Sequence, residues 1–450
     1  MTTKILLAAA LALGLTARAE TVKEIRLITL DPGHFHASLV QKKMYPQVNP
    51  VVHVYSPGGA DLEQHLKRIE SFNTRAENPT RWQEKVYTGK DFFEKMIAEK
   101  TGNVVVISGN NARKAKYILA CVEAGLNVLA DKPMAITPAD FRLLEKAFIV
   151  ARQRGVFLLD IMTERHEITT ILQRELSMQP GVFGSLDEGT PDDPAVTKIS
   201  VHHFSKEVAG KPLIRPPWFF DVKQQGEAIV DVTTHLVDLI QWECCPGQSL
   251  APSEASVISA KRWATAITPQ QFKKATGLDS FPDYLKPNIG KDGAIHIDSN
   301  GAFTFALRGV HAKVSVEWRF EAPPGTGDTH YSLMRGTRAA LIIRQGKEQN
   351  YKPTLYVEKR AATTDAEFER VLRTAITAIA KTWPGIDAKK NDAGWEIVIP
   401  DQYKNGHEAH FAQVAEKYLG FLAAVKMTDW EVPNMITKYN TIMQAYKLSR

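Results

Sequence analysis

The chain has 450 residues, of which 44% are hydrophobic and 24% are charged, a composition typical of a globular protein with two or three domains. Its 56 basic and 50 acidic residues leave a net charge of +6 without a long run of one sign, so we expect no nucleic-acid partner. Three cysteines, two of them adjacent, are too few for a disulfide framework or a zinc motif.

The first residues have the pattern of an export signal. Lys4 precedes an apolar run at residues 5–15, and Ala17 and Ala19 fit the small-residue rule for cleavage after residue 19. The run is too short to span a bilayer as a helix. We therefore expect a signal peptide at residues 1–19 and an exported protein, periplasmic or secreted, with no membrane insertion after the signal is removed. An apolar N-terminal helix is the alternative.

Strands and helices alternate over the next part of the chain, residues 20–160. Strands are predicted at residues 25–30, 51–55, 104–107, 127–130 and 156–159, and helices at 36–43, 91–99, 112–124 and 137–154, with a partly helical polar stretch at 61–85. Such alternation predicts an α/β domain with a parallel sheet that is covered by helices on both faces.

The pattern changes in the rest of the chain, residues 161–450. Strands are predicted at residues 197–204, 302–307, 313–320, 332–335, 340–343 and 355–358, and helices at 366–381, 407–424 and 435–448. The dipeptide Asn300-Gly301 is a hairpin signal. These features predict an α+β domain with a mainly antiparallel sheet.

The turn after the first strand reads LDPGHFHA, at residues 30–37. Dinucleotide-binding folds carry a Gly-x-Gly-x-x-Gly turn at this place, but here only Gly33 is a glycine, and Asp31 and His36 take the other two places. Gly33 would let the backbone approach a pyrophosphate. His34 and His36 would contact phosphate or face the ligand crevice. A turn that holds no nucleotide is the alternative.

Two later segments carry candidate chemistry. Asp131-Lys132-Pro133 follows a strand, and ligands of doubly wound sheets bind at the C-terminal ends of strands, although Lys132 could equally be a surface lysine. Asp231, His235 and Asp238 have the spacing i, i+4 and i+7, which places them on one face of a helix. A carboxylate one turn from an imidazole can raise its basicity, which suits acid–base catalysis. In the alternative interpretation, Asp231 caps the helix and His235 is a core residue.

Together and in this order, the two segments resemble the Gfo/Idh/MocA family, named after glucose–fructose oxidoreductase and inositol dehydrogenase. The family carries a Glu-Lys-Pro motif, seen here as Asp131-Lys132-Pro133, and a Gly-Gly-x-x-x-Asp-x-Gly-x-His-x-x-Asp motif. The second motif keeps Gly226, Asp231, His235 and Asp238, whereas Glu227 and Thr233 replace its other glycines. The stretch from Ser108 to Arg113 replaces a Thr-Pro-Asn-x-x-His sequence.

The resemblance implies a Rossmann dinucleotide-binding domain at residues 20–160. At residues 161–450 it implies an α+β domain with an open, mainly antiparallel sheet for substrate binding and possible homo-oligomerisation. By matching position, Lys132 would stabilise the developing alkoxide and His235 would accept the proton. Asp231 would orient His235 or bind a neighbouring hydroxyl. The implied cofactor-binding residues are Asp31, Gly33, His34, Phe35, His36, Ser56, Ser108, Gly109, Asn110, Asp131, Lys132 and Pro133. The implied substrate-binding residues are Arg165, His203, Trp218, Asp231 and His235.

The function that the resemblance implies is hydride transfer from a hydroxyl of a sugar, cyclitol or glycoside to tightly held NAD, with NADP left open. Two alternatives stay open: an enzyme that retains NAD and cleaves glycosides by oxidation and elimination, and a non-catalytic module that binds a carbohydrate or a partner. No metal site is expected, because no carboxylate or cysteine completes a site around any of the 13 histidines in the sequence.

Overall fold

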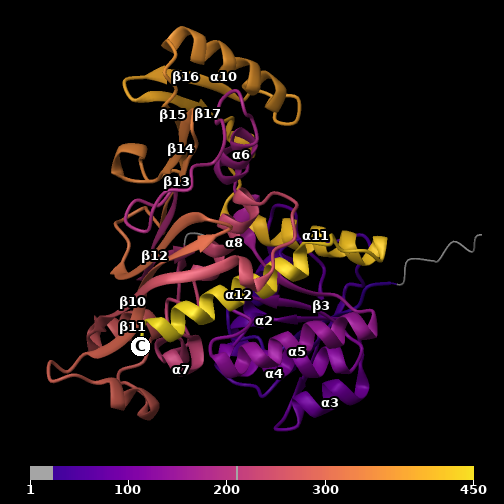
Figure 1. Ribbon diagram of the computed structural model, residues 1–450. Coiled ribbons are helices and arrows are strands. Elements are labelled where there is room, and N and C mark those ends of the chain that lie inside the picture. Colours follow the sequence, from indigo (N-terminus) through magenta and orange to yellow (C-terminus); the bar gives the residue numbers. More distant parts are fainter. Residues whose placement is uncertain (1–23, 209–210) are drawn as a thin grey trace, which may run out of the picture.

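The computed structural model describes residues 24–208 and 211–450, so the signal peptide expected at residues 1–19 lies outside the described residues. The described chain forms a six-stranded sheet, a nine-stranded sheet and a two-stranded ladder (Figure 1). This arrangement confirms the predicted fold class.

The six-stranded sheet is parallel throughout and has the strand order β3-β2-β1-β4-β5-β6. Its strands are β1 (Leu27–Leu30), β2 (Val51–Ser56), β3 (Gln83–Thr88), β4 (Val104–Ile107), β5 (Asn127–Asp131) and β6 (Leu158–Ile161). The helices between them are α1 (His36–Leu39), α2 (Ala60–Thr74), α3 (Phe92–Glu99), α4 (Asn111–Glu123) and α5 (Pro138–Arg154). Strands β1, β4 and β6 are buried along their whole length, as expected for a sheet with both faces covered.

Strand β3 was not among the predicted strands. It lies at the edge of the sheet, and its sequence QEKVYT has no fully buried residue, so it lacks the apolar run by which the inner strands were recognised. The polar stretch at residues 61–85 therefore contains most of helix α2 and the start of an edge strand.

The nine-stranded sheet has the order β10-β11-β12-β7-β13-β14-β15-β17-β16, and only the β12–β7 pair is parallel. Its strands are β7 (Val196–Ser205), β10 (Ala255–Ile267), β11 (Ile295–Leu307), β12 (Val310–Glu321), β13 (Thr329–Arg335), β14 (Ala339–Arg344), β15 (Thr354–Lys359), β16 (Asp387–Asn391) and β17 (Gly394–Val398). The ladder consists of β8 (Glu207–Val208) and β9 (Lys211–Pro212). The helices are α6 (Ile168–Ser177), α7 (Val222–Gln225), α8 (Thr233–Cys244), α9 (Pro269–Thr276), α10 (Asp365–Ile379), α11 (His407–Ala424) and α12 (Glu431–Leu448).

The predicted hairpin at Asn300-Gly301 is wrong, because both residues lie inside β11 and pair with β10. The turn between β11 and β12 is formed instead by Arg308 and Gly309, which both have positive φ, as a two-residue hairpin turn requires. Glycine is needed at position 301 for a different reason. A Cβ there would lie 2.4 Å from Cγ1 of Ile229, so the segment before α8 packs directly on this strand.

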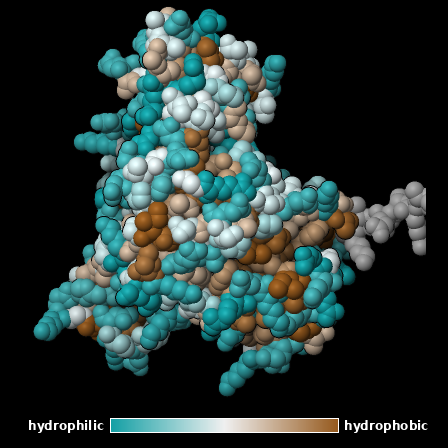
Figure 2. Space-filling view, viewed as in Figure 1, coloured by the Kyte–Doolittle hydropathy of each residue, from teal (hydrophilic) through white to brown (hydrophobic). Residues whose placement is uncertain are grey.

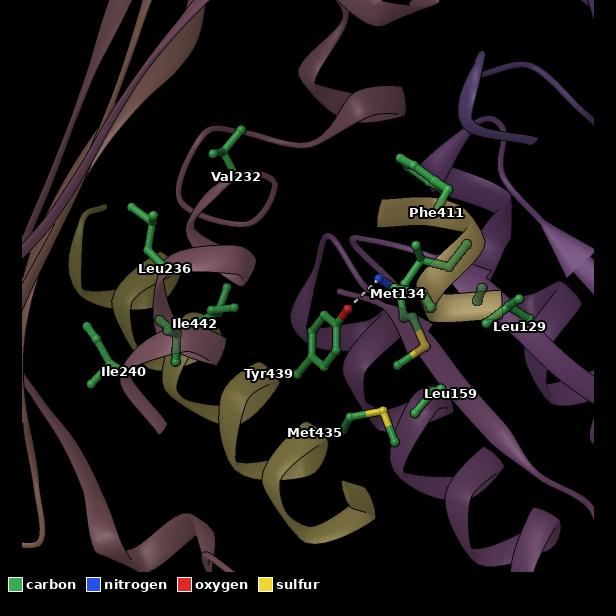
Figure 3. Close-up of a cluster of buried hydrophobic side chains, with 14 of the residues drawn as sticks. Leu129, Met134, Leu159, Val232, Leu236, Ile240, Phe411, Met435, Tyr439 and Ile442 are labelled. Atoms are coloured by element: carbon green, nitrogen blue, oxygen red, sulfur yellow. Dashed lines mark hydrogen bonds between the residues drawn. The ribbon is translucent and has the colours of Figure 1, made fainter. Parts of the chain in front are cut away.

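The C-terminal helix α12 joins the two parts of the molecule and contacts β10, α8, α5 and β6 (Figure 1). Figure 3 shows Tyr439 of this helix beside Met134, which follows β5. The Tyr439 hydroxyl accepts a hydrogen bond from the Met134 amide at 3.0 Å and donates to Asp160 at 3.2 Å. The loop after β5, which carries Lys132, is therefore fixed against the second part of the chain.

The outer surface is mostly hydrophilic on the face in Figure 2, with small groups of hydrophobic residues near its middle. Within residues 24–208 and 211–450, no helix combines the length and the apolar character that crossing a membrane requires.

Candidate active site

A cavity of about 970 Å³ lies where the C-terminal ends of the parallel strands face the second sheet. Side chains from both parts of the chain line it. Of the residues singled out in the sequence, those that line this cavity are His34, Phe35, His36, Gly109, Asp131, Lys132, Asp231 and His235. The crevice expected at the strand ends therefore exists and holds all three candidate catalytic residues.

Lys132 and Asp231 form an ion pair in this cavity. Nζ of Lys132 lies 2.7 Å from Oδ1 of Asp231, and the two side chains are only 12% and 5% exposed. Oδ2 of Asp231 accepts a hydrogen bond from Gln225 at 3.0 Å. Burial alone would raise the pKa of Asp231, but the Lys132 ammonium and the Gln225 amide hold it below its ordinary value. Both charges are thus retained inside the protein.

His235 lies on the first turn of α8 and is uncharged at neutral pH. Burial, followed by the charge of Lys132, lowers the pKa of His235 to about 3. Its Nδ1 atom is buried and has no hydrogen-bond partner within the described part of the chain. The residue itself lines the cavity, so a neutral imidazole is available there to a bound molecule.

The expected partnership between Asp231 and His235 is wrong. Helix α8 begins at Thr233, so Asp231 precedes it, and its carboxylate binds Lys132 and Gln225. The basicity of His235 is therefore not raised by a paired carboxylate. Sequence spacing alone could not show this, because Gln225 and Lys132 come from outside the helix.

Asp238 is the member of the motif that does not reach the cavity. Both of its carboxylate oxygens accept hydrogen bonds from Arg165 at 2.6 Å, and Lys438 donates to it at 2.8 Å. Arg165 also binds Glu431, and Lys438 also pairs with Asp160, so all five side chains form one buried ionic network. Arg165 was expected to contact the substrate, but it lies in this buried network and does not line the cavity.

The turn at Asp31–His36 differs from a glycine-rich phosphate turn. The amides of Gly33 and His34 both donate to the carbonyl of Ser108 at 3.2 Å, although amides at this place commonly face a pyrophosphate. A Cβ on Gly33 would lie 3.1 Å from Asp61 and 3.2 Å from Trp218. Glycine at this position therefore serves close packing against protein atoms.

Both histidines of the turn point toward Asp131 in the cavity. Nδ1 of His36 lies 3.0 Å and Nδ1 of His34 lies 3.6 Å from Oδ2 of Asp131, which also accepts a hydrogen bond from Ser108 at 2.9 Å. Of the two expectations for these histidines, the structure favours the one in which they face the crevice beside Lys132.

The remaining residues singled out in the sequence do not line the cavity. The carboxylate of Asp31 accepts from Arg113 and Tyr117, the hydroxyl of Ser56 accepts from the Gly58 amide, and Asn110 caps α4. Trp218 donates to Asp61, His203 contacts Asp328, and Pro133 follows Lys132 through a cis peptide bond. These residues support the walls of the site.

Several cavity residues were absent from the set predicted in the sequence. They are Ser200, Arg215, Phe219, Gln225, Trp318, Asp328, His330 and His407. Half of them lie on the second sheet or on α11, where isolated polar residues form no recognisable motif. Alternation along β7 was the one available signal, since it placed Ser200 and His202 on the same side of a strand.

Comparisons with known proteins agree with this architecture. Residues 34–158 match the family described as "Oxidoreductase family, NAD-binding Rossmann fold", and residues 172–450 match the one described as "Putative oxidoreductase C terminal domain". A solved structure of a "putative oxidoreductase" from Parabacteroides merdae is 52% identical, with a TM-score of 0.92 over 95% of this chain and 97% of that chain. No curated protein matches the chain.

More distant solved structures share the fold. A levoglucosan dehydrogenase in complex with NADH and levoglucosan is 13% identical, with a TM-score of 0.58 over 94% of this chain and 98% of that one. A biliverdin reductase from Synechocystis sp. in complex with biliverdin and NADP+ is 11% identical, with a TM-score of 0.56 over 94% and 99%. With its fold, its cavity and these matches, the chain belongs to the Gfo/Idh/MocA family of NAD(P)-dependent oxidoreductases.

Proposed function

We propose that the protein oxidises a hydroxyl of a sugar, cyclitol or glycoside, with NAD or NADP as the hydride acceptor. The central observation is the buried ion pair of Lys132 and Asp231 next to the uncharged His235, inside a cavity at the strand ends. This set joins a fixed positive charge to a free proton acceptor, which is what removal of a proton from a hydroxyl requires.

The lining of the cavity supports a polyhydroxy substrate. Polar side chains such as Gln225, Ser200 and His202 surround it, and the rings of Trp318 and Phe219 add apolar faces. A few directed polar groups among larger apolar surfaces are typical of small-molecule sites. The volume of about 970 Å³ is at the upper end of the range for such sites, which leaves room for a sugar and part of a nucleotide.

The residues around Lys132 fit the nicotinamide end of a dinucleotide. His235 and Lys132 line the same cavity, so they can serve a substrate bound against a nicotinamide ring. When bound, the nucleotide supplies the hydride acceptor. The diphosphate must be held by groups other than the amides of Gly33 and His34, because those amides donate to Ser108.

Lys132 and His235 divide the work on the hydroxyl. The ammonium of Lys132 has three donors, of which one is bound to Asp231, so the others can hydrogen-bond the oxygen of the reacting hydroxyl and stabilise it as an alkoxide. Asp231 holds the ammonium of Lys132 at the cavity through their ion pair. His235 accepts the proton, and its low pKa then favours passing that proton on to solvent.

The test begins with the cofactor. The protein is purified and denatured, and the supernatant is assayed for NAD(H) and NADP(H); protein without cofactor is titrated with each. Polyols and glycosides are then screened for formation of reduced cofactor. We expect Lys132→Met to abolish turnover while cofactor binding is kept, and Lys404→Met, at another cavity lysine, to keep turnover. Absence of cofactor binding at millimolar concentration contradicts the proposal.

Export, tight retention of NAD and oligomerisation are further parts of this proposal. The N-terminal pattern supports export. The end of β6, the last strand of the parallel sheet, at Ile161 supports a division of the chain near residue 160. Cell fractionation tests export, and gel filtration with light scattering tests the oligomeric state. Product release without net reduced cofactor would instead indicate the glycoside-cleaving alternative.

A further inference from the structure

We propose that His34, His36 and Asp131 bind a divalent transition-metal ion of the class of Zn²⁺, Co²⁺ and Fe²⁺. The site lies in the wall of the cavity, beside Lys132. It goes beyond the proposed oxidation, since it requires neither a bound nucleotide nor a substrate.

Two departures from the family motifs meet at this point. His36 stands at the place of the third glycine in the first turn, and Asp131 stands at the place of the glutamate that precedes the motif lysine. The two positions are 95 residues apart in the sequence, yet Nδ1 of His36 lies 3.0 Å from Oδ2 of Asp131. His36 thus supplies a nitrogen that can bind a metal, and Asp131 supplies a carboxylate oxygen beside it.

The spacing of the ligand atoms suits one small ion. Neighbouring ligands of a tetrahedral zinc ion, with bonds of about 2.0–2.2 Å, lie roughly 3.4 Å apart. The imidazole nitrogens of His36 and His34 lie 3.0 and 3.6 Å from Oδ2 of Asp131, and one ligand atom from each residue lies within 4.8 Å of the others. Two imidazoles and a carboxylate are the protein ligands of many zinc and iron sites with an open position.

The carboxylate of Asp131 has unused binding capacity. Asp131 is only 3% exposed, and its Oδ1 atom is buried without a hydrogen-bond partner in residues 24–208 and 211–450. Its other oxygen accepts from the hydroxyl of Ser108 at 2.9 Å, an outer contact of the kind that orients metal-binding carboxylates. The carboxylate therefore has room for a cation, which no described side chain supplies through Oδ1.

Neither of the two neighbouring lysines donates to the carboxylate of Asp131. Lys132 pairs with Asp231, and the ammonium of Lys114 donates to the backbone carbonyl of Asp131 at 2.9 Å. All three proposed ligands line the cavity, so a water molecule or a substrate oxygen can reach the open coordination position. The ring of His407 lies 5.7 Å from that of His36 and offers a further nitrogen from α11.

A second histidine–aspartate cluster in the same cavity provides an internal control. His202 and His203 lie 2.9 and 3.3 Å from the two oxygens of Asp328, but the ammonium of Lys206 also binds that carboxylate. Because a lysine already neutralises Asp328, we assign the metal to Asp131 and not to this cluster.

The experiment measures metal binding by protein stripped with a chelator and free of nucleotide. Zinc is added in equilibrium dialysis and bound metal is counted by elemental analysis, while Co²⁺ is used to record the visible spectrum of a low-symmetry site. We expect one equivalent of zinc. His34→Gln and Asp131→Asn should each weaken zinc binding by more than about 100-fold, Ser108→Ala should weaken it by about 10-fold, and His202→Gln should leave it unchanged.

Zinc binding that survives both His34→Gln and Asp131→Asn overturns the proposal, as does the absence of any bound equivalent. Circular dichroism confirms that each variant is folded. If Asp131→Asn does not fold, the 16% exposed His34 decides the question through His34→Gln. Since no nucleotide or substrate is present, failure of metal binding is distinct from failure of the proposed oxidation.

Discussion

Two ionic systems connect the parallel sheet and its loops to the second part of the chain, and they are built differently. Lys132 and Asp231 meet at the cavity, where a bound molecule can reach them. Arg165, Asp238 and Lys438 meet in the interior, where side chains from β6 and α12 complete the network. The same sequence motif supplies Asp231 to the first and Asp238 to the second.

The difference lies in how completely the hydrogen-bonding groups are satisfied. In the interior network, Asp238 receives bonds from Arg165 and Lys438, and the second partner of each cation is another carboxylate. At the cavity, His235 keeps an unpartnered nitrogen. A buried group without a partner is costly, so one that lies beside an ion pair in a cavity marks a candidate functional site, whereas a closed network serves position and stability.

The largest expected effect comes from breaking the interior network with Asp238→Ala. The change leaves the guanidinium of Arg165 and the ammonium of Lys438 without their shared buried carboxylate, which should cost about 3–5 kcal/mol of unfolding free energy. Urea denaturation measures the loss. A change below about 1 kcal/mol would show that Glu431 and Asp160 alone can hold both cations.

Breaking the cavity pair with Lys132→Met should affect turnover instead. Removing the donor that we propose to stabilise the alkoxide should lower kcat about 10²–10³-fold, while the thermal unfolding midpoint changes little. Steady-state kinetics and thermal denaturation of the same preparation separate the two effects. Unfolding comparable to that of Asp238→Ala would assign this pair to structure as well.

A smaller effect is expected from Arg165→Lys. Lysine keeps the charge but cannot bind both oxygens of Asp238 and also reach Glu431, so we expect a loss of about 1.5–3 kcal/mol. The urea midpoint should fall while the Michaelis constant for substrate stays unchanged. A raised Michaelis constant would instead indicate that Arg165 contacts the substrate, as the sequence predicted.

A pH-dependent effect concerns buried histidines that lack a carboxylate partner. Burial lowers the pKa of His65, His235 and His330 to about 3, whereas each titrates near 6.5 when the chain unfolds. Below pH 6.5 the unfolded chain binds protons that the folded chain cannot, so stability falls by up to about 1.4 kcal/mol per pH unit for each histidine. Above pH 6.5 this effect vanishes.

Urea denaturation between pH 7 and pH 4 checks this dependence, and His65→Leu sharpens it. Neither ring nitrogen of His65 has a partner among the described residues. Leucine at this position should therefore reduce the change of unfolding free energy with pH by the contribution of one histidine, and it should leave Asp238 and its network unchanged. An unchanged pH dependence would indicate that protonation of carboxylates, and not of His65, causes the loss of stability in acid.

Much of the architecture could be predicted from local patterns. The apolar runs of β1, β4 and β5 and the boundaries of α5 and α11 follow from burial on both faces and from helical periodicity, which depend only on neighbouring residues. Strands β3 and β16 escaped prediction because edge strands with exposed side chains have no such run. The Asn300-Gly301 dipeptide misled because close packing against Ile229, and not a turn, requires that glycine.

The sequence by itself determined the order of the two sheets, the family motifs and the presence of Lys132, Asp231 and His235 at one crevice. This was possible because a fold fixes the place of each motif relative to its strands. Only the tertiary structure decided the partners: Gln225 for Asp231, Asp238 for Arg165, and Asp131 for His34 and His36. These contacts join residues from separate elements, and most are far apart along the chain. Hydrogen bonds and charges act over a few ångströms in space, so spacing along the chain could not reveal which carboxylate each cation and each histidine would meet.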